Sequence, residues 1–251
     1  MSIAARIGDD SNRSFALVDV ASAQAISGDI RGALDTAQTI ESIRVHHSIW
    51  PLSDIVRAQM ERGDAAGAAQ SIGTAMRAAS RIAEEGDRTN AFANIAAMQA
   101  EAGDTIGAAN SFNRALQLVQ RIADPSERNF ALEKIAWTQA GTGDIAGALA
   151  TVRRLPADYN AWWALKTIAE AQARAGDTSG ASATAQRVLD AQYRAQSFAG
   201  IAEVQMKAGD TLGAARLIVE ALTTAEHIGD YDDSIWAYTA IARVQLEGGT
   251  P

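Results

Sequence analysis

Residues 95–108 read Ile95-Ala-Ala-Met-Gln-Ala-Glu-Ala-Gly-Asp-Thr-Ile-Gly-Ala108, and parts of this stretch recur along the whole chain. The constant part is a Gln followed four residues later by a Gly, and all copies but the last then have an Asp. Repetition at a period of about 20–50 residues is typical of solenoid proteins. The stretch therefore predicts a stack of similar units. The seven pairs are Gln24/Gly28, Gln59/Gly63, Gln99/Gly103, Gln139/Gly143, Gln172/Gly176, Gln205/Gly209 and Gln245/Gly249.

Each copy has the features of a helical hairpin. The residues seven and four before each Gln are large and apolar, as at Phe92 and Ile95, and on a helix they lie within about 40° of the Gln. The Gly can end this first helix in the left-handed conformation. The following Asp can cap a second helix, and the small Gly-Ala pair after it allows the two helices to pack closely.

These residues resemble the tetratricopeptide repeat family, from about residue 12 to residue 249. The resemblance implies an all-α fold, a right-handed α–α superhelix (solenoid) of about six helical hairpins plus a terminal helix. The chain has Gln where the family usually has Tyr, and most copies lack the Pro that usually closes a repeat. The residues that carry the resemblance in one copy are Phe92, Ile95, Ala96, Gly103, Asp104, Ala108, Phe112, Ala115 and Leu116.

The predicted organisation is a single repeat domain over residues 1–251. Successive Gly residues are 35, 40, 40, 33, 33 and 40 apart, and seven extra residues are about two helical turns. We therefore expect three lengthened second helices, one running from Ala65 to about Glu84. The chain closes on a first helix, 233–247, that either caps the array or leaves an excised or self-associating end. The repeats are expected near 12–41, 48–84, 87–123, 126–155, 158–190 and 192–228, with the terminal helix at 231–247.

Composition narrows the classes of function. The 251 residues carry a formal net charge of −8, which argues against nucleic acid as the partner. No apolar run approaches the ~18 residues that span a bilayer, so no membrane insertion is expected. The first residues contain no signal-peptide core. The absence of Cys excludes disulfides and thiolate zinc sites and fits a reducing compartment, so we expect a cytoplasmic protein.

Two recurrent polar residues have a structural and a functional interpretation. The favoured interpretation of the Gln is a semi-buried amide bonded to backbone at the hairpin turn or in the next repeat; the alternative is a clamp on a bound peptide. An Arg stands eleven residues before four of the Gln residues. We expect it to form local or inter-repeat ion pairs, and the alternative is a row that binds anions. These residues are Arg13, Arg88, Arg128 and Arg194.

Candidate partner-binding residues lie on the opposite side of the first helices. Positions nine and two before the Gln are rotated by about 180° from it, and five of the seven residues at the first position are aromatic. The resemblance implies that first helices line a concave groove, and aromatic and Arg side chains dominate binding hot spots. The alternative is that the aromatics fill contacts between adjacent first helices. The candidates are Trp50, Arg57, Asn90, Phe130, Glu133, Trp137, Trp163, Lys166, Glu170, Gln196, Glu203, Trp236 and Arg243.

No enzymatic pattern, cofactor site or metal site is predicted. The His residues are the pair His46-His47 and a distant His227, and phosphate-loop and nucleophile motifs are missing. We expect a non-enzymatic scaffold that binds a protein or peptide on its concave face. The negative net charge favours a partner of mixed or mildly basic character. The alternative is a self-assembling array that forms a homo-oligomer through its end helices or its aromatic face.

Overall fold

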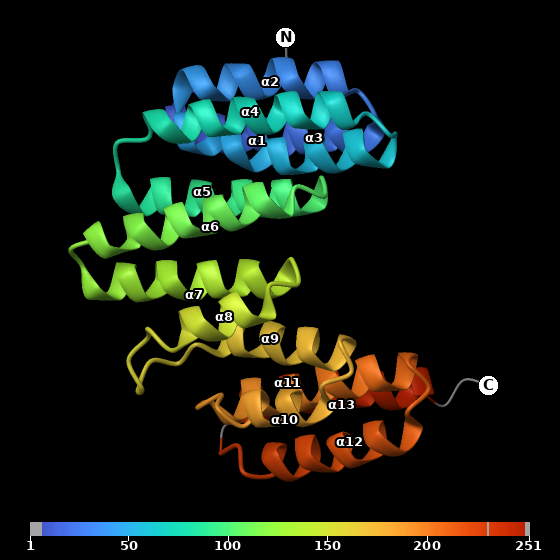
Figure 1. The fold of residues 1–251 in the computed structure, drawn as a ribbon. Helices are drawn as coiled ribbons and strands as arrows, with labels where there is room; N and C mark the ends of the chain where they lie inside the picture. The colour runs from blue at the N-terminus through green and yellow to red at the C-terminus, as the bar shows by residue number, and fades with distance from the viewer. Residues whose placement is uncertain (1–6, 230, 249–251) are drawn as a thin grey trace. The chain divides into compact units, whose positions relative to one another are not determined.

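The structure is a computed structural model in which residues 7–229 and 231–248 are described. These residues form thirteen α-helices and two short 3-10 helices, without any strand, so the predicted all-α fold is confirmed (Figure 1). The elements are α1 Asp10–Ser27, α2 Ile30–Ile43, η2 Val45–Ser48, α3 Ile49–Glu61, α4 Ala65–Arg81, α5 Glu85–Glu101, α6 Thr105–Leu118, η3 Val119–Arg121, α7 Pro125–Gly141, α8 Ile145–Val152, α9 Trp162–Arg174, α10 Thr178–Ala185, α11 Ala191–Lys207, α12 Thr211–Ala225 and α13 Tyr231–Gly248.

Successive helices form six hairpins, α1/α2 to α11/α12, and α13 follows as a single first helix. The joint of each hairpin has the predicted caps. In α5/α6, Gly103 has a φ of +80°, and its N–H donates to the Ala100 carbonyl at 3.0 Å. The Asp104 N–H donates to the Gln99 carbonyl at 2.8 Å, which completes a Schellman motif. The Asp104 carboxylate then accepts the Gly107 N–H at 2.8 Å and caps α6.

The lengths of the second helices follow the repeat spacing. In the repeats with the 40-residue spacing α4 has 17 residues, α6 has 14 and α12 has 15, whereas α8 and α10 have 8 each. The predicted end of α4 near Glu84 is wrong by three residues. The reason is that the Glu84 carboxylate accepts the Asp87 N–H at 2.9 Å and caps α5. The terminal helix begins at Tyr231, as the bounds 231–247 predicted, and not at Asp233.

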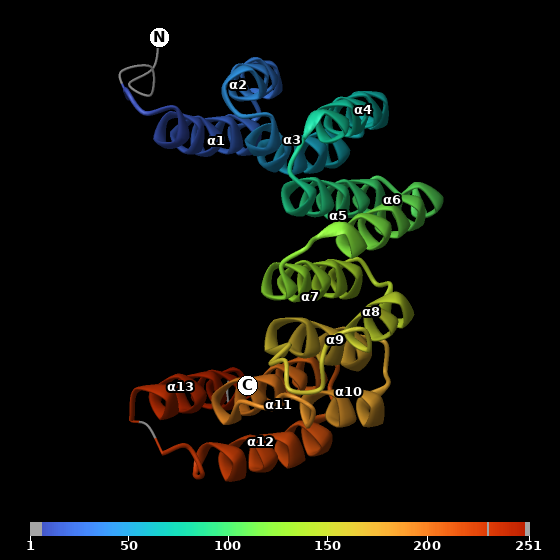
Figure 2. The ribbon, with the colours of Figure 1, turned by 90° about the vertical axis from the view of Figure 1, so that its left-hand side faces the viewer.

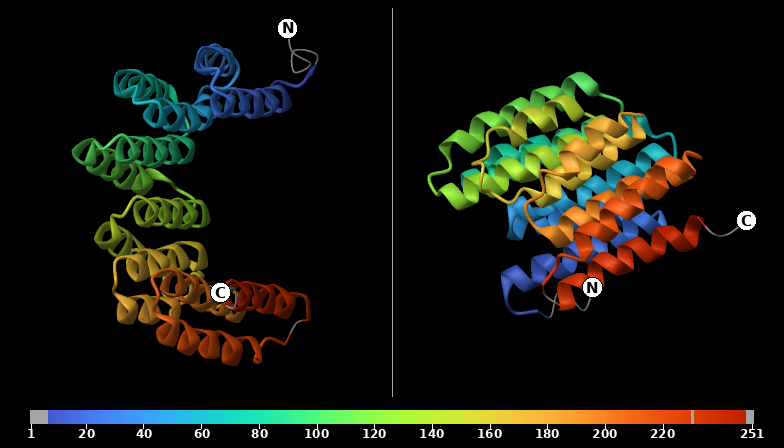
Figure 3. Two further views of the ribbon diagram at one scale, coloured as in Figure 1. Left: turned by 90° about the vertical axis from the view of Figure 1, so that its right-hand side faces the viewer. Right: turned by 90° about the horizontal axis from the view of Figure 1, so that it is seen from below.

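The chain divides within α7 into two compact units, Met1–Ile135 and Ala136–Pro251, and the prediction of one domain stays a prediction. In the first unit α1, α3 and α5 pack in succession, α2 packs on α1 and α3, and α4 packs on α3 and α5 (Figure 2). In the second unit α11 packs between α9 and α13, with α12 below them in Figures 2 and 3. None of the helices formed by the described residues is both long and apolar enough to cross a membrane.

Candidate functional site

The recurrent Gln ties the two helices of each hairpin together. Gln99 is buried, and its Oε1 accepts a hydrogen bond from the Ser111 hydroxyl at 2.6 Å. A Ser or Thr occupies the same position, twelve residues after the Gln, in each of the first five hairpins. The Gln is therefore structural, but its side-chain partner is a hydroxyl and not the predicted backbone group. The hydroxyls that donate to the Gln Oε1 atoms belong to Thr36, Ser71, Ser111, Thr151 and Thr184.

The same joint explains the Gly of the Gly-Ala pair. A Cβ added at Gly107 would lie 2.5 Å from Gln99 Nε2, and closer still to the Asp104 carboxylate. The space that a side chain would need is already filled by the capping carboxylate and the amide. In the α7/α8 hairpin these two groups bond directly, since Gln139 Nε2 donates to Asp144 Oδ2 at 2.9 Å. Gln, Asp, Gly and Ser or Thr therefore form one packed unit.

In four of the first helices, the recurrent Arg side chain donates a hydrogen bond to a backbone carbonyl in the connection that precedes the helix. Arg128 donates to the Ile122 carbonyl at 3.1 Å, and Arg194 donates to the Val188 carbonyl at 3.0 Å, six residues earlier in both cases. Arg13 and Arg88 make longer bonds to the carbonyls at the same spacing. The expected local ion pair is also formed at Arg88, with Glu85 at 2.5 Å. These guanidinium groups thus stabilise the turns between hairpins.

Four of the five candidate aromatic residues are exposed, and the fifth, Trp137, is half-buried against the core of the second unit. The exposed fractions are 39% for Trp50, 51% for Phe130, 44% for Trp163 and 63% for Trp236, as expected for positions opposite the buried Gln. Some of them also contact one another. Trp163 lies 5.0 Å from Trp137, measured between ring centroids, and Trp50 stacks on His47 at 4.9 Å. The face therefore offers aromatic surface, with part of it used in contacts within each unit.

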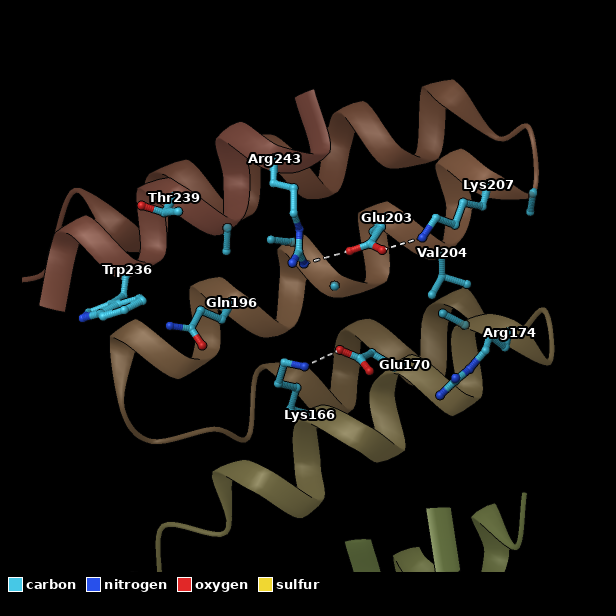
Figure 4. A pocket seen from close by; sticks show the side chains of 15 residues that line it. Lys166, Glu170, Arg174, Gln196, Glu203, Val204, Lys207, Trp236, Thr239 and Arg243 are labelled. Atoms are coloured by element: carbon cyan, nitrogen blue, oxygen red, sulfur yellow. Dashed lines mark hydrogen bonds and ion pairs between the residues drawn. The ribbon is translucent and has the colours of Figure 1, made fainter. Parts of the chain in front are cut away.

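A groove of about 860 Å³ lies on this face in the second unit, lined by α9, α11 and α13 (Figure 4). Three consecutive first helices bring together side chains that are about thirty to forty residues apart in sequence. Trp236 stands at one end of the groove, and the charged side chains lie along it. Six of the predicted residues line it, namely Lys166, Glu170, Gln196, Glu203, Trp236 and Arg243.

Ion pairs organise the polar lining of this groove. Lys166 pairs with Glu170 at 2.6 Å within α9. Glu203 of α11 pairs with Lys207 at 2.6 Å and with Arg243 of α13 at 3.0 Å (Figure 4). The hydrogen bond from Lys207, together with the charge of Arg243, lowers the pKa of Glu203 below its usual value. Glu203 therefore holds α11 and α13 together as a carboxylate.

Two cationic residues of the groove were missed by the sequence analysis. Arg174 and Lys207 both line it and stand two residues after Gln172 and Gln205. The position two after the Gln is four residues, about one helical turn, from the position two before it. Both positions therefore lie on nearly the same face of the helix. With these two residues the lining contains four Lys or Arg and two Glu. The groove is thus positively charged in a chain of net charge −8.

The other candidate residues lie outside this groove. Trp137 and Trp163 belong to the same unit but do not line it. In the first unit Arg57 pairs with Asp54 and Glu101, each at 3.2 Å. Asn90 is half-buried in that unit, where Trp50 and Phe130 also lie. The prediction that Glu133 faces a partner is wrong, because only 7% of it is exposed. Its position, six before the Gln, lies about 120° from it, on the flank of the helix.

Comparisons with known proteins bear on the fold. No protein-family model matches the sequence, and the search of curated proteins finds no match. Among solved structures the chain is similar to the crystal structure of Ton1535 from Thermococcus onnurineus NA1, with 16% sequence identity and a TM-score of 0.50. The alignment covers 93% of this chain and 92% of that one. At this identity the likeness concerns the fold alone: an all-α protein of helical hairpins.

Proposed function

We propose that this protein is a non-enzymatic scaffold, similar to tetratricopeptide repeat proteins, that binds a peptide segment of a partner protein on its first helices. The observation that carries the proposal is the groove of α9, α11 and α13, because it gathers six of the predicted binding residues. Its volume of about 860 Å³ is within the range of ligand-binding pockets, about 300–1,000 Å³. Trp236, 63% exposed, provides an aromatic anchor.

The charge of the groove favours a segment that carries carboxylates. This revises the expectation of a mildly basic partner, which rested on the net charge of the whole chain. Lys166, Lys207 and Arg243 already have Glu partners, but these ion pairs are in contact with solvent, since each side chain is 22–66% exposed, and they contribute only about 1 kcal/mol each. A carboxylate of the partner can therefore replace or join them at small cost, while Arg174 adds a further cation.

A site-specific dye tests the proposal, since the chain contains no Cys. Thr239 lines the groove, and a Thr239→Cys variant labelled with an environment-sensitive dye reports binding there. A short peptide of Glu-Asp-Leu repeats should shift the dye emission, whereas a Gln-Asn-Leu counterpart should bind at least about tenfold more weakly. Adding Lys166→Gln and Arg243→Gln should weaken the acidic peptide about tenfold. The matched control, Trp50→Ala in the other unit, should have no effect. Equal binding by a Lys-Arg-Leu peptide would contradict the proposal.

A second candidate function, self-assembly, is favoured by the exposed side of α13. Tyr238 stands seven before Gln245 and is 41% exposed, whereas the residues at this position in the six hairpins are buried at 1–8%. Leu246 is 74% exposed on the same helix. A second helix covers the equivalent surface in every hairpin, and a second copy of the chain could cover it here. Light scattering should then show an average mass that increases with protein concentration, and the Tyr238→Ser/Leu246→Ser variant should remove this increase. A mass that stays at the monomer value at every concentration would refute self-assembly.

A further inference from the structure

A second groove lies in the first unit, on the side of the second helices. It runs between α4 and α6, has a volume of about 690 Å³, and has Phe92 of α5 in its lining. A smaller cavity of about 300 Å³ adjoins it, since both are lined by Ser80, Arg114 and Gln117. The two together form a channel that none of the candidate partner-binding residues lines, although the recurrent Gln99 and Arg88, whose alternative roles are a peptide clamp and an anion-binding row, belong to its lining. It is separate from the groove of α9, α11 and α13, which belongs to the other unit.

The charged residues that line this channel are all positive. The lining contains Arg77, Arg88, Arg114 and Arg121 and no Asp or Glu. The helices α4 and α6 themselves carry only Arg among their charged residues. This is a local separation of charge, because residues 1–135 contain 17 Asp and Glu against 13 Lys and Arg. The channel therefore attracts anions on an otherwise acidic unit.

Two of these Arg residues are available to a ligand. Arg77 is exposed and donates to the Thr74 hydroxyl at 2.9 Å, and the Arg114 guanidinium lies 4.8 Å from the ring centroid of Phe92. Neither forms an ion pair with any carboxylate that the structure describes. The other two lining Arg residues differ in this respect, since Arg88 and Arg121 both pair with Glu85, at 2.5 and 4.0 Å. The nearby Arg81 pairs with Glu41 at 2.5 Å.

The remaining lining side chains fit a polypeptide better than a phosphate or a nucleic acid. Asn110, Asn113 and Gln117 stand on one side of α6 at helical spacing and are exposed. Their amides can both donate to carbonyls and accept from N–H groups of an extended main chain. Met76, 42% exposed, adds apolar surface for a side chain. A nucleic acid would need a longer basic track and would meet a chain of net charge −8.

We propose that this channel binds an extended acidic peptide segment of a partner protein. Its carboxylates pair with Arg77 and Arg114, and its main chain bonds to the amides of α6. The site would let one chain hold two acidic segments, one on each unit. It does not depend on the first groove, because the two share no residue.

The experiment uses a dye on the channel itself. Ser80 is exposed and lines both cavities, so a labelled Ser80→Cys variant reports binding there independently of the dye at residue 239. The peptide of Glu-Asp-Leu repeats should bind, and Arg77→Gln/Arg114→Gln should weaken it about tenfold. Arg114→Lys should retain most of the affinity. The matched control, Arg31→Gln/Arg216→Gln, removes two exposed cations from other second helices and should change nothing.

Several results would overturn the proposal. One is equal affinity of wild type and Arg77→Gln/Arg114→Gln, with both shown to be folded by circular dichroism. Another is a Gln-Asn-Leu peptide that binds as tightly as the acidic one. A third is displacement of the peptide by inorganic phosphate or single-stranded RNA at matched charge concentration, which would make the channel a general anion site. If the acidic peptide changes the emission of the dye at residue 239 but not of the dye at residue 80, the channel is not a binding site, and the proposal for the groove of α9, α11 and α13 stands alone.

Discussion

Replacing Gln99 by Leu tests the hairpin joint most directly. Leu has nearly the same volume, so the packing is kept, but the buried Ser111 hydroxyl loses the Oε1 acceptor that lies 2.6 Å away. Leaving a buried polar group without its partner costs about 1–3 kcal/mol. We therefore expect the free energy of unfolding to fall by about 2 kcal/mol, which corresponds to a thermal midpoint lower by about 4–8 °C for a chain of this size.

The sixth hairpin provides a matched control within the same chain. Gln205 is buried like the others, but Leu217 stands where they have Ser or Thr, and the Oε1 of Gln205 has no hydrogen-bond partner. Its amide donates only to the Thr178 hydroxyl, at 2.9 Å. Gln205→Leu should therefore cost less than Gln99→Leu, by about 1 kcal/mol or more.

Urea unfolding followed by circular dichroism, with hydrogen exchange to locate the change, measures both variants. The double variant Gln99→Leu/Ser111→Ala removes both partners and should recover part of the loss. Equal losses for Gln99→Leu and Gln205→Leu would refute the reasoning, because the two side chains differ in the hydroxyl partner. An unchanged stability of Gln99→Leu would refute the structural role of the Gln altogether.

Three further predictions concern the same scaffold. Gly107→Ala should destabilise the protein by about 1–3 kcal/mol in thermal unfolding, because the new Cβ would clash with Gln99 and Asp104. Gly73→Ala should instead stabilise it by about 0.5–1 kcal/mol, since no atom would lie closer than 3.6 Å to the new Cβ. Burial is the main cause that lowers the pKa of His47, so the unfolded chain binds a proton more readily than the folded one. The free energy of unfolding should therefore fall as the pH drops below about 6.5. Urea titrations at several pH values should show this dependence, and His47→Asn should flatten it. Arg194→Gln removes the bond to the Val188 carbonyl and should cost about 1 kcal/mol, with faster hydrogen exchange before α11 if the bond holds that connection and unchanged exchange if it does not.

The positive lining of both grooves shows why net charge is a poor guide to the partner. Some carboxylates of this chain cap helices at the joints, as Asp104 and Asp144 do, and others, such as Glu170 and Glu203, already pair with cations. The cations stand on the sides of helices that line the grooves. A partner bound in either groove would contact these cations, so the local charge rather than the net charge would decide its chemistry.

The sequence by itself determined the hairpins, their joints and which face of each first helix is buried. The helix caps at each joint depend on interactions between residues at most five apart, such as the bond from the Asp104 N–H to the Gln99 carbonyl, and such contacts follow from residue type and spacing alone. The sequence also predicted six lining residues of the groove: helical periodicity places five of them opposite the Gln, and the sixth, Lys166, lies on the flank of the helix, six residues before Gln172.

Only the tertiary structure decided which of those residues meet. The repeats differ in spacing, so the packing of α9, α11 and α13 determines that Glu203 bridges Lys207 and Arg243. The burial of Glu133 likewise depends on its neighbours in space. The channel between α4 and α6 was not predicted from the sequence, since its Arg residues stand at four different positions relative to the Gln, on α4, α5, α6 and η3, and come together only in the folded structure. Contacts between helices depend on long-range packing, and residue spacing does not record it.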